Sequence, residues 1–298
     1  VLFIDVDYFK RMRPGPLRRI DLFHGLLALA YPLLAWLLLI LAGFVAGFVD
    51  SIAGGGGLIT VPALLLAGAN PLQALATNKL QGTFGAGTAM LTYARAGHVR
   101  LQDQFLMAAV SAAAGAAGAL VAHLIPADVL RLTMPVILIA VALFFALKPG
   151  LSDDARAQRM APGVFAFTAV PLIAAYDGFF GPGTGSFFMI GFVMLAGFGV
   201  LKATAHTKTL NFASNIGSLL VFIPSGATWW AVGIAMALAQ VAGATTHGAR
   251  VPVTVEGHEL VVSASMGVSL LPDNAREISA LVSQSNMAMQ HAKHLGGN

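Results

Sequence analysis

Charged side chains rarely interrupt the long apolar runs of this sequence, and those that do fall into two similar groups. In the first group Asp50 ends an apolar run, a glycine-rich turn follows in FVDSIAGGGG, and Lys79 comes later within ATNKLQG. In the second group Asp177 begins the turn YDGFFGPGTG, and Lys208 follows within KATAHTKTLNFASN. A charge at membrane depth costs roughly 2.5–3.5 kcal/mol on insertion scales, so such residues are functional candidates by default. We therefore predict that these four side chains belong to one functional site.

The residues around these charges suit the binding of a small anion. A glycine turn that breaks a helix leaves unsatisfied N–H groups at a positive helix end, which attract anions. The neighbouring lysine, histidine and amide side chains would add hydrogen-bond donors. A sulfite, a sulfonate or a carboxylate fits such a set. The predicted substrate-binding residues are Asp50, Gly54, Gly55, Gly56, Gly57, Asn78, Lys79, Gln81, Asp177, Gly181, Gly183, His206, Lys208, Asn211 and Asn215.

A structural interpretation of the same residues stays open. Asp50 with Lys79, and Asp177 with Lys208, could be intramembrane ion pairs that only pin the helix breaks, each charge offsetting the other. The two interpretations are compatible if the pairs also frame the site. A phosphate loop is excluded, because no Gly-Lys-Ser/Thr sequence follows Gly57. We expect no metal site and no cofactor.

The two groups recur at a nearly constant offset, which indicates an internal duplication. Asp50 and Asp177 are 127 positions apart, and Gly54 and Gly181 are separated by the same distance. Acid, glycine turn and lysine repeat in the same order, as they do in transporters built from two structural repeats. We therefore expect a site made of two related halves.

The composition places the chain in a lipid bilayer. The sequence is 57% hydrophobic and only 10% charged, whereas ordinary soluble domains carry about 25% charged residues. The apolar runs predict an all-α polytopic membrane protein, a duplicated bundle of about seven spans with broken helices. The expected apolar segments are 22–49, 58–68, 80–93, 105–125, 132–147, 164–180, 186–201, 210–223 and 229–244.

The flanks of the apolar core indicate its orientation and its limits. A basic cluster precedes the first run, and the positive-inside rule places it in the cytoplasm of a bacterial inner-membrane protein; it contains Lys10, Arg11, Arg13, Arg18 and Arg19. We expect five parts: a basic flank at 1–21, a first repeat at 22–147, a charged loop at 148–160, a second repeat lacking its last span at 161–247, and a small C-terminal fragment at 248–298. A missing span would expose packing faces, so either poor stability or homodimerisation is expected.

Four motifs together resemble the TauE/SafE sulfite exporter family, in its YfcA-like branch. They are FVDSIAGGGGLITVPALLLAG, ALATNKLQ, YDGFFGPGTGSF and KATAHTKTLNFASNIGSL, and the resemblance covers about residues 24–246. It implies a duplicated, eight-span permease that moves sulfur-containing or carboxylate anions. By position it also implies that the polar residues named above contribute to the site from both repeats.

The two termini resemble pieces of a GGDEF (diguanylate cyclase) domain. VLFIDVDYFKR at 1–11 is similar to its first strand, with Asp5 at a magnesium-binding position and Lys10 at a phosphate-contacting one. VSASMGVSLLPDN is similar to its penultimate strand, and MAMQHAKHLGGN is similar to its last helix. We expect a small α/β remnant, with two strands joined at Glu256-Gly257 and a helix over about 275–294. The signature that seats GTP is absent from the sequence, so no enzyme activity is expected.

Three functions remain open at this point. A secondary anion transporter, coupled to protons or to the membrane potential through Asp50, Asp177 or His206, explains the charged residues best. A membrane sensor with a catalytically dead GGDEF remnant is the second. A non-functional fusion of two unrelated genes is the third. The expected partners are the lipid bilayer, a small anion and protons, with no nucleic acid.

Overall fold

The computed structural model describes residues 19–147, 157–248, 253–255 and 258–260. The chain divides into two compact units, Val1–His247 and Gly248–Asn298, which are described separately. The expected strand at 1–11 and the expected helix over 275–294 lie outside the described residues.

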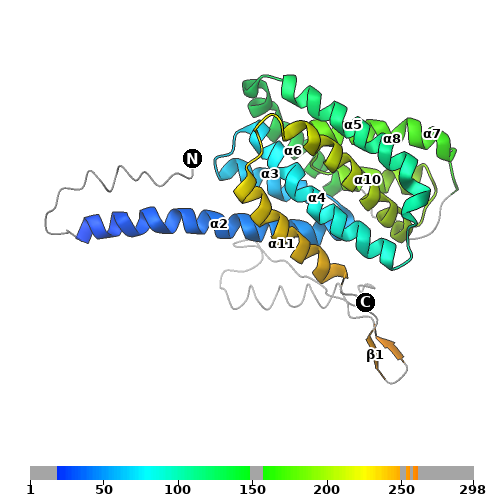
Figure 1. The fold of residues 1–298 in the computed structure, drawn as a ribbon, viewed down its shortest axis with the longest axis horizontal. Coiled ribbons are helices and arrows are strands. Elements are labelled where there is room, and N and C mark those ends of the chain that lie inside the picture. Colours follow the sequence, from blue (N-terminus) through cyan, green and yellow to red (C-terminus); the bar gives the residue numbers. More distant parts are fainter. Residues whose placement is uncertain (1–18, 148–156, 249–252, 256–257, 261–298) are drawn as a thin grey trace. The chain divides into compact units, whose positions relative to one another are not determined.

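The first unit is entirely helical over its described residues (Figure 1). Its first half contains α2 (Arg19–Ala53), α3 (Gly57–Leu66), α4 (Pro71–Arg95), the 3-10 helix η1 (Leu101–Gln104), α5 (Phe105–Leu124) and α6 (Ala127–Leu147). Its second half contains α7 (Pro162–Phe167), α8 (Ala169–Phe179), α9 (Thr184–Met194), α10 (Val200–Phe222) and α11 (Trp230–Gly248). The glycine turns interrupt the helices as predicted, one between α2 and α3 and the other between α8 and α9.

The polar clusters do not break the helices, and this corrects the expectation that each cluster separates two short apolar pieces. ATNKLQG lies inside the continuous helix α4, and KATAHTKTLNFASN lies inside α10. The sequence also predicts a break at Asn70-Pro71, and the structure confirms it between α3 and α4. Asn70 caps α4 by accepting a hydrogen bond from Gln73 N at 2.8 Å, and Pro71 starts the helix. A helix keeps its own backbone hydrogen bonds, so polar side chains can be carried through the bilayer without a break.

Close helix packing depends on glycine. The largest interfaces join α5 to α8 and α10, and α10 to α4, and these helices lie side by side in Figure 1. A Cβ on Gly118 of α5 would lie 1.9 Å from Ala175 O, and one on Gly178 of α8 would lie 1.8 Å from Gly115 O. Small residues therefore let these backbones approach, as in other membrane helix pairs.

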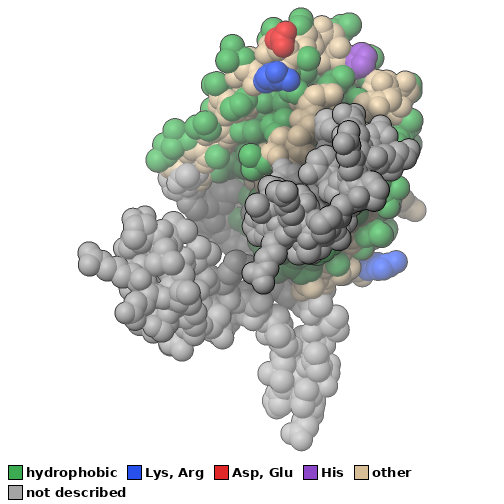
Figure 2. All heavy atoms as spheres, turned by 90° about the vertical axis from the view of Figure 1, so that its left-hand side faces the viewer, with side chains coloured by type: hydrophobic (Ala, Val, Ile, Leu, Met, Phe, Trp, Pro, Cys, Tyr) green, Lys and Arg blue, Asp and Glu red, His purple; other side chains and the backbone are tan. Residues whose placement is uncertain are grey.

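The first unit buries four charged side chains and exposes many apolar ones, the reverse of a water-soluble protein. Lys79 and Lys208 are fully buried, whereas Leu124 is 81% exposed and leucines line the outer faces of α2 and α6. Figure 2 shows one face on which the described side chains are mainly hydrophobic, with few charges. Four described segments are long and apolar enough to cross a membrane: Leu33–Ile52, Leu101–Leu124, Ala127–Phe145 and Pro162–Phe179. This distribution is that of a multi-pass membrane protein.

In the second unit the structure describes one hairpin. Strands β1 (Val253–Val255) and β2 (His258–Leu260) pair antiparallel, with Thr254 opposite Glu259. The two strands predicted on either side of Glu256-Gly257 are therefore present.

Candidate functional site

The two glycine turns meet inside the helical unit. Gly54 adopts φ +79°, a left-handed conformation that glycine tolerates best. A Cβ added to it would lie 2.5 Å from the carbonyl carbon of Gly185, and one added to Gly57 would lie 3.1 Å from Pro182 Cα. Backbone from the two halves is thus in direct contact, at the level where α3 and α9 begin.

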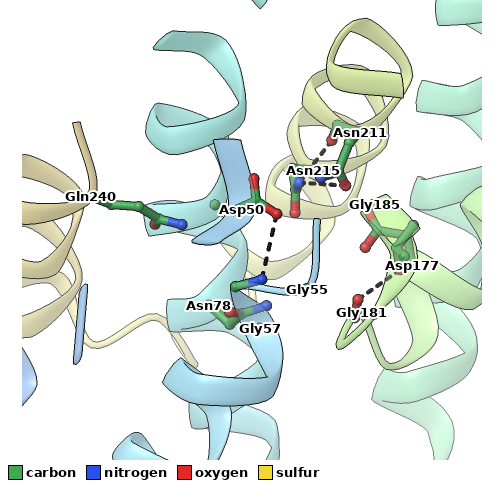
Figure 3. A pocket seen from close by; sticks show the side chains of 14 residues that line it. Asp50, Gly55, Gly57, Asn78, Asp177, Gly181, Gly185, Asn211, Asn215 and Gln240 are labelled. Atoms are coloured by element: carbon green, nitrogen blue, oxygen red, sulfur yellow. Dashed lines mark hydrogen bonds between the residues drawn. The ribbon is translucent and has the colours of Figure 1, made fainter. Parts of the chain in front are cut away.

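A polar pocket with a cavity volume of about 30 Å³ lies at this junction (Figure 3). Both turns, both aspartates and several amides form its wall. Its lining residues are Asp50, Gly55, Gly56, Gly57, Asn78, Gly82, Asp177, Gly181, Gly183, Thr184, Gly185, Asn211, Asn215 and Gln240. Residues from α2, α3, α4, α8, α9, α10 and α11 therefore converge on one site.

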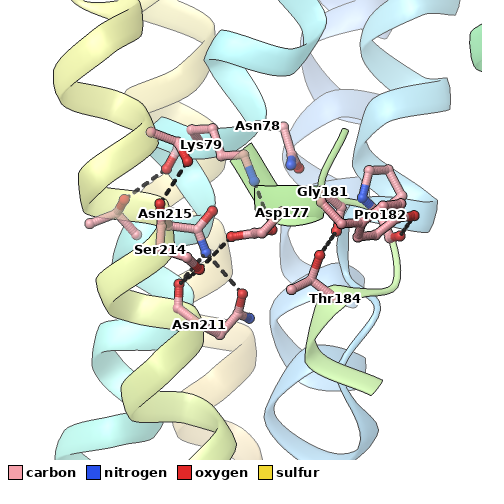
Figure 4. Close-up of polar contacts among 12 residues, drawn as sticks. Asn78, Lys79, Asp177, Gly181, Pro182, Thr184, Asn211, Ser214 and Asn215 are labelled. Atoms are coloured by element: carbon pink, nitrogen blue, oxygen red, sulfur yellow. Dashed lines mark hydrogen bonds and ion pairs between the residues drawn. The ribbon is translucent and has the colours of Figure 1, made fainter. Parts of the chain in front are cut away.

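The two buried ion pairs cross between the halves. Lys79 Nζ lies 2.7 Å from Asp177 Oδ1 (Figure 4), and Lys208 Nζ lies 3.5 Å from Asp50 Oδ2 while also contacting the carbonyl oxygen of Asp50. The pairs considered from sequence, Asp50 with Lys79 and Asp177 with Lys208, are therefore wrong. Each lysine is carried on a helix that packs toward the other half, so its ammonium reaches the other half's acid.

The two aspartates are held differently. Both carboxylate oxygens of Asp177 make short contacts (Figure 4). Oδ1 lies 2.7 Å from Lys79 Nζ, and Oδ2 accepts a hydrogen bond from Ser214 Oγ at 2.5 Å. Asp50 has longer contacts, with Gly56 N–H donating to its Oδ1 at an N–O distance of 3.5 Å. Asp177 is thus the more firmly fixed of the two acids.

The amides on α4 and α10 are also organised by hydrogen bonds. Asn78 Oδ1 accepts from Thr60 Oγ1 at 2.7 Å and from Gln81 Nε2 at 3.3 Å. Asn215 Nδ2 donates to the backbone oxygen of Asn211 at 2.7 Å and to its Oδ1 at 3.2 Å. These contacts fix the acceptor oxygen of Asn78 and hold Asn211 and Asn215 together at the pocket wall.

Some predicted site residues lie behind or away from this pocket. Lys79, Lys208, Gln81 and Gly54 do not line it, and the lysines reach it only through the aspartates that they pair with. His206 contacts Gln104 through Nδ1, and its ring packs against two phenylalanines, with centroids 5.5 Å from Phe192 and 4.9 Å from Phe198.

Four pocket residues were absent from the predicted set, and each had a signal in the sequence. Thr184 and Gly185 belong to the turn GPGTG, and Gly82 follows Gln81 directly. Gln240 is the single side chain with an amide, hydroxyl or charge between Trp230 and Thr245. A lone polar side chain in an apolar span is itself a candidate for function.

Two helices begin at the pocket without side-chain caps. Neither α3, which starts after Gly56, nor α9, which starts after Gly183, has a side-chain hydrogen bond at its N-cap. Asn70 caps α4, whereas α5, α7, α8 and α10 also begin without a side-chain cap, so the position of α3 and α9 at the pocket is what distinguishes them. Each helix N-terminus carries roughly half a positive elementary charge. The pocket thus offers two positive helix ends, several amides and two carboxylates paired with lysines.

A buried polar site enclosed by apolar, lipid-facing helices is the arrangement of a membrane transporter. The chain belongs to the sulfite exporter TauE/SafE family, whose pattern it matches over residues 39–260. It is 55% identical over 252 residues to the probable membrane transporter protein ORF9 of Sinorhizobium sp., a match that covers 82% of this chain and 95% of that protein. It is 45% identical over 249 residues to the probable membrane transporter protein YfcA of Escherichia coli strain K12, covering 82% and 91%. These names point to a transporter rather than an enzyme.

A second match concerns the C-terminal part. Residues 232–298 match the diguanylate cyclase GGDEF domain family. A stretch of 58 residues is 40% identical to an uncharacterized signaling protein of Caulobacter vibrioides, covering 20% of this chain and 7% of that protein. No solved structure gives a significant match to the chain.

Proposed function

We propose that this protein is a permease for small anions of the sulfite, sulfonate or carboxylate type, and that the pocket at the two glycine turns is its substrate site. The observation that carries the proposal is the pair of uncapped helix N-termini, α3 and α9, which begin at one pocket. Together they contribute roughly one positive elementary charge. The lysines and aspartates sum to zero formal charge, so the helix ends favour an anion.

The lysines support this site without lining it. Lys79 and Lys208 offset the charges of Asp177 and Asp50, which would otherwise repel an anion from the pocket. The proposed donors at the pocket wall are the amides of Asn78 and Asn211 and the backbone N–H groups of Gly55, Gly57, Gly183 and Gly185. Gln81 would act through Asn78, to which it donates.

Flux measurements test the proposal. In proteoliposomes containing the full chain, we expect uptake of labelled sulfite or acetate, and its loss in Lys79→Ala and Lys208→Ala. Lys202→Ala is the matched control, because Lys202 lies on the same helix as Lys208 but is exposed and packs over the Phe198 ring. Wild-type flux in both the Lys79→Ala and the Lys208→Ala variants would overturn the assignment of the site.

We further propose that the site joins two duplicated halves of about seven spans, residues 22–147 and 161–247. The supporting observation is that helix, glycine turn, helix and lysine-bearing helix recur in the same order as α2–α4 and α8–α10.

The proposal includes an inner-membrane location with a cytoplasmic N-terminus. A homodimer, expected from the sequence, is testable by native mass spectrometry.

Proton coupling is proposed through Asp50 or Asp177, which line the pocket, in preference to His206, which packs outside it. In at least one of the variants Asp50→Asn and Asp177→Asn, anion flux should no longer respond to an imposed pH gradient. Gradient-dependent flux in both variants would contradict this coupling.

The GGDEF match favours a second function, a sensor in which the C-terminal part binds a nucleotide or a partner. Titration of the full-length protein with GTP and cyclic di-GMP tests it. Saturable binding would support a sensor, and its absence would leave the permease as the better assignment. The DNA sequence across both boundaries of the permease region would show whether one reading frame encodes a fusion.

A further inference from the structure

Gln240 is a buried polar residue of the pocket that no sequence motif assigned. It lies on α11, is only 3% exposed, and lines the pocket. In Figure 3 its side chain points from α11 toward Asp50. It is the sole contribution of α11 to the pocket wall.

Two glycines leave the space through which Gln240 reaches the pocket. A Cβ on Gly47 of α2 would lie 2.1 Å from the backbone oxygen of Gln240, so that glycine lets α11 approach α2 at this level. A Cβ on Gly85 of α4 would lie 2.7 Å from both Cγ and Cδ of the Gln240 side chain. The slot at Gly85 is therefore occupied by the glutamine side chain itself.

The amide of Gln240 is incompletely satisfied. Its Oε1 is buried and has no hydrogen-bond partner among the described residues. Asn78, Asn211 and Asn215 differ in this respect, because each takes part in side-chain hydrogen bonds. A buried polar group without a partner costs free energy, and an amide can turn either its oxygen or its N–H groups toward a ligand.

The corresponding position in the first half does not face the pocket. The offset that relates Lys79 to Lys208 relates Ser111 to Gln240. Ser111 Oγ donates to the backbone oxygen of Leu210 at 2.8 Å, and Ser111 is not among the residues of the pocket wall. Gln240 thus gives the pocket an amide from α11 for which the Ser111 position supplies no counterpart.

We propose that Gln240 is a substrate-binding residue that donates its side-chain N–H to an oxygen of the bound anion and fixes the orientation of that anion. The inference rests on the proposed anion site. Because this donor would come from α11, the site would favour anions that place an oxygen beside Gln240. Gln240 would therefore contribute to selectivity among oxyanions.

Two substitutions separate the donor from the shape of the side chain. Gln240→Met keeps an unbranched chain of similar length without a donor, and Gln240→Glu keeps the shape and adds a negative charge. Gln158→Met is the control, because Gln158 is exposed and lies outside the pocket. The binding of sulfite, methanesulfonate and acetate to the purified full chain is measured by the rise in melting temperature with anion concentration.

We expect wild type to bind at least one anion, Gln240→Met to bind it about tenfold or more weakly, and Gln240→Glu to show no binding. A hydrogen bond to a charged group has the strength required for that change. Wild-type affinity in both Gln240 variants would overturn the role of Gln240 alone. Failure of wild type to bind any of the three anions would instead overturn the proposed function.

Gly85→Ala supplies an independent measurement if the Gln240 variants fold poorly. The added methyl should displace the Gln240 side chain and weaken anion binding, while the amide itself is retained. In a Gln240→Ala background the same change should weaken binding no further. Unchanged affinity in Gly85→Ala, or a full additional loss in the double variant, would overturn the proposal.

Discussion

Lys79 and Asp177 form the shorter of the two buried ion pairs, and their side chains are 0% and 3% exposed. Lys79 Nζ is 2.7 Å from Asp177 Oδ1, and both side chains are buried. Removing one partner of such a pair leaves a buried charge without a counter-charge, which destabilises the folded protein. Removing both charges avoids that desolvation cost.

We expect Lys79→Met to lose about 3–5 kcal/mol of stability, and Lys79→Met/Asp177→Asn to lose less than the single variant. Melting temperatures in detergent, followed by tryptophan fluorescence, measure this order. Lys202→Met on α10 should melt close to wild type, because Lys202 is exposed. A double variant less stable than Lys79→Met would contradict the pairing.

The unequal contacts of the two aspartates predict unequal losses. Asp177→Asn disrupts two contacts of 2.5 and 2.7 Å, whereas the carboxylate contacts of Asp50 are both 3.5 Å. Asp177→Asn should therefore lower the melting temperature more than Asp50→Asn does. An equal or reversed order would show that the geometry of the two acids does not govern stability.

At the scale of the elements, the turns between α2 and α3 and between α8 and α9 act as one unit. Helices α3 and α9 begin where the turn backbones touch, so their N-termini are positioned by that contact. A side chain between the turns would separate the helix ends that form the pocket.

Gly54→Ala tests this contact, and Gly97→Ala is its matched control. The two glycines have nearly the same φ, +79° and +78°, but a Cβ on Gly97 meets nothing within 4 Å. Both variants carry the cost of a left-handed alanine, roughly 1–2 kcal/mol. Only Gly54→Ala should also lose anion binding, measured by the anion-dependent melting shift. Equal effects of the two changes would show that the turn contact is unimportant for the site.

At the scale of the whole molecule, apolar outer faces and buried charges make the bilayer part of the fold. The segment Leu101–Leu124 is long enough to cross it, because an α-helix rises 1.5 Å per residue and the hydrocarbon core is about 30 Å thick. The loops before and after this segment should therefore face opposite sides of the membrane.

Single cysteines test this topology without background labelling, because the sequence contains no cysteine. His98→Cys and Asp128→Cys lie on exposed positions at the two ends of that segment. A membrane-impermeant maleimide added to spheroplasts should label Asp128→Cys. The same reagent should label His98→Cys only after the membrane is permeabilised. Labelling of both from the same side would contradict a crossing at α5.

The amino-acid sequence was sufficient to predict the bilayer location, the helix breaks at the glycine turns and most residues of the pocket wall. Bilayer location follows from composition, and the turns follow from glycine, because both are local properties. The pairing of Lys79 with Asp177, the position of His206 outside the pocket and the inclusion of Gln240 were decided by the tertiary structure. They depend on how α4, α8, α10 and α11 pack, and residues far apart in the chain are brought together only by that packing. Sequence determined which charges enter the membrane, and the fold determined which partner each one meets.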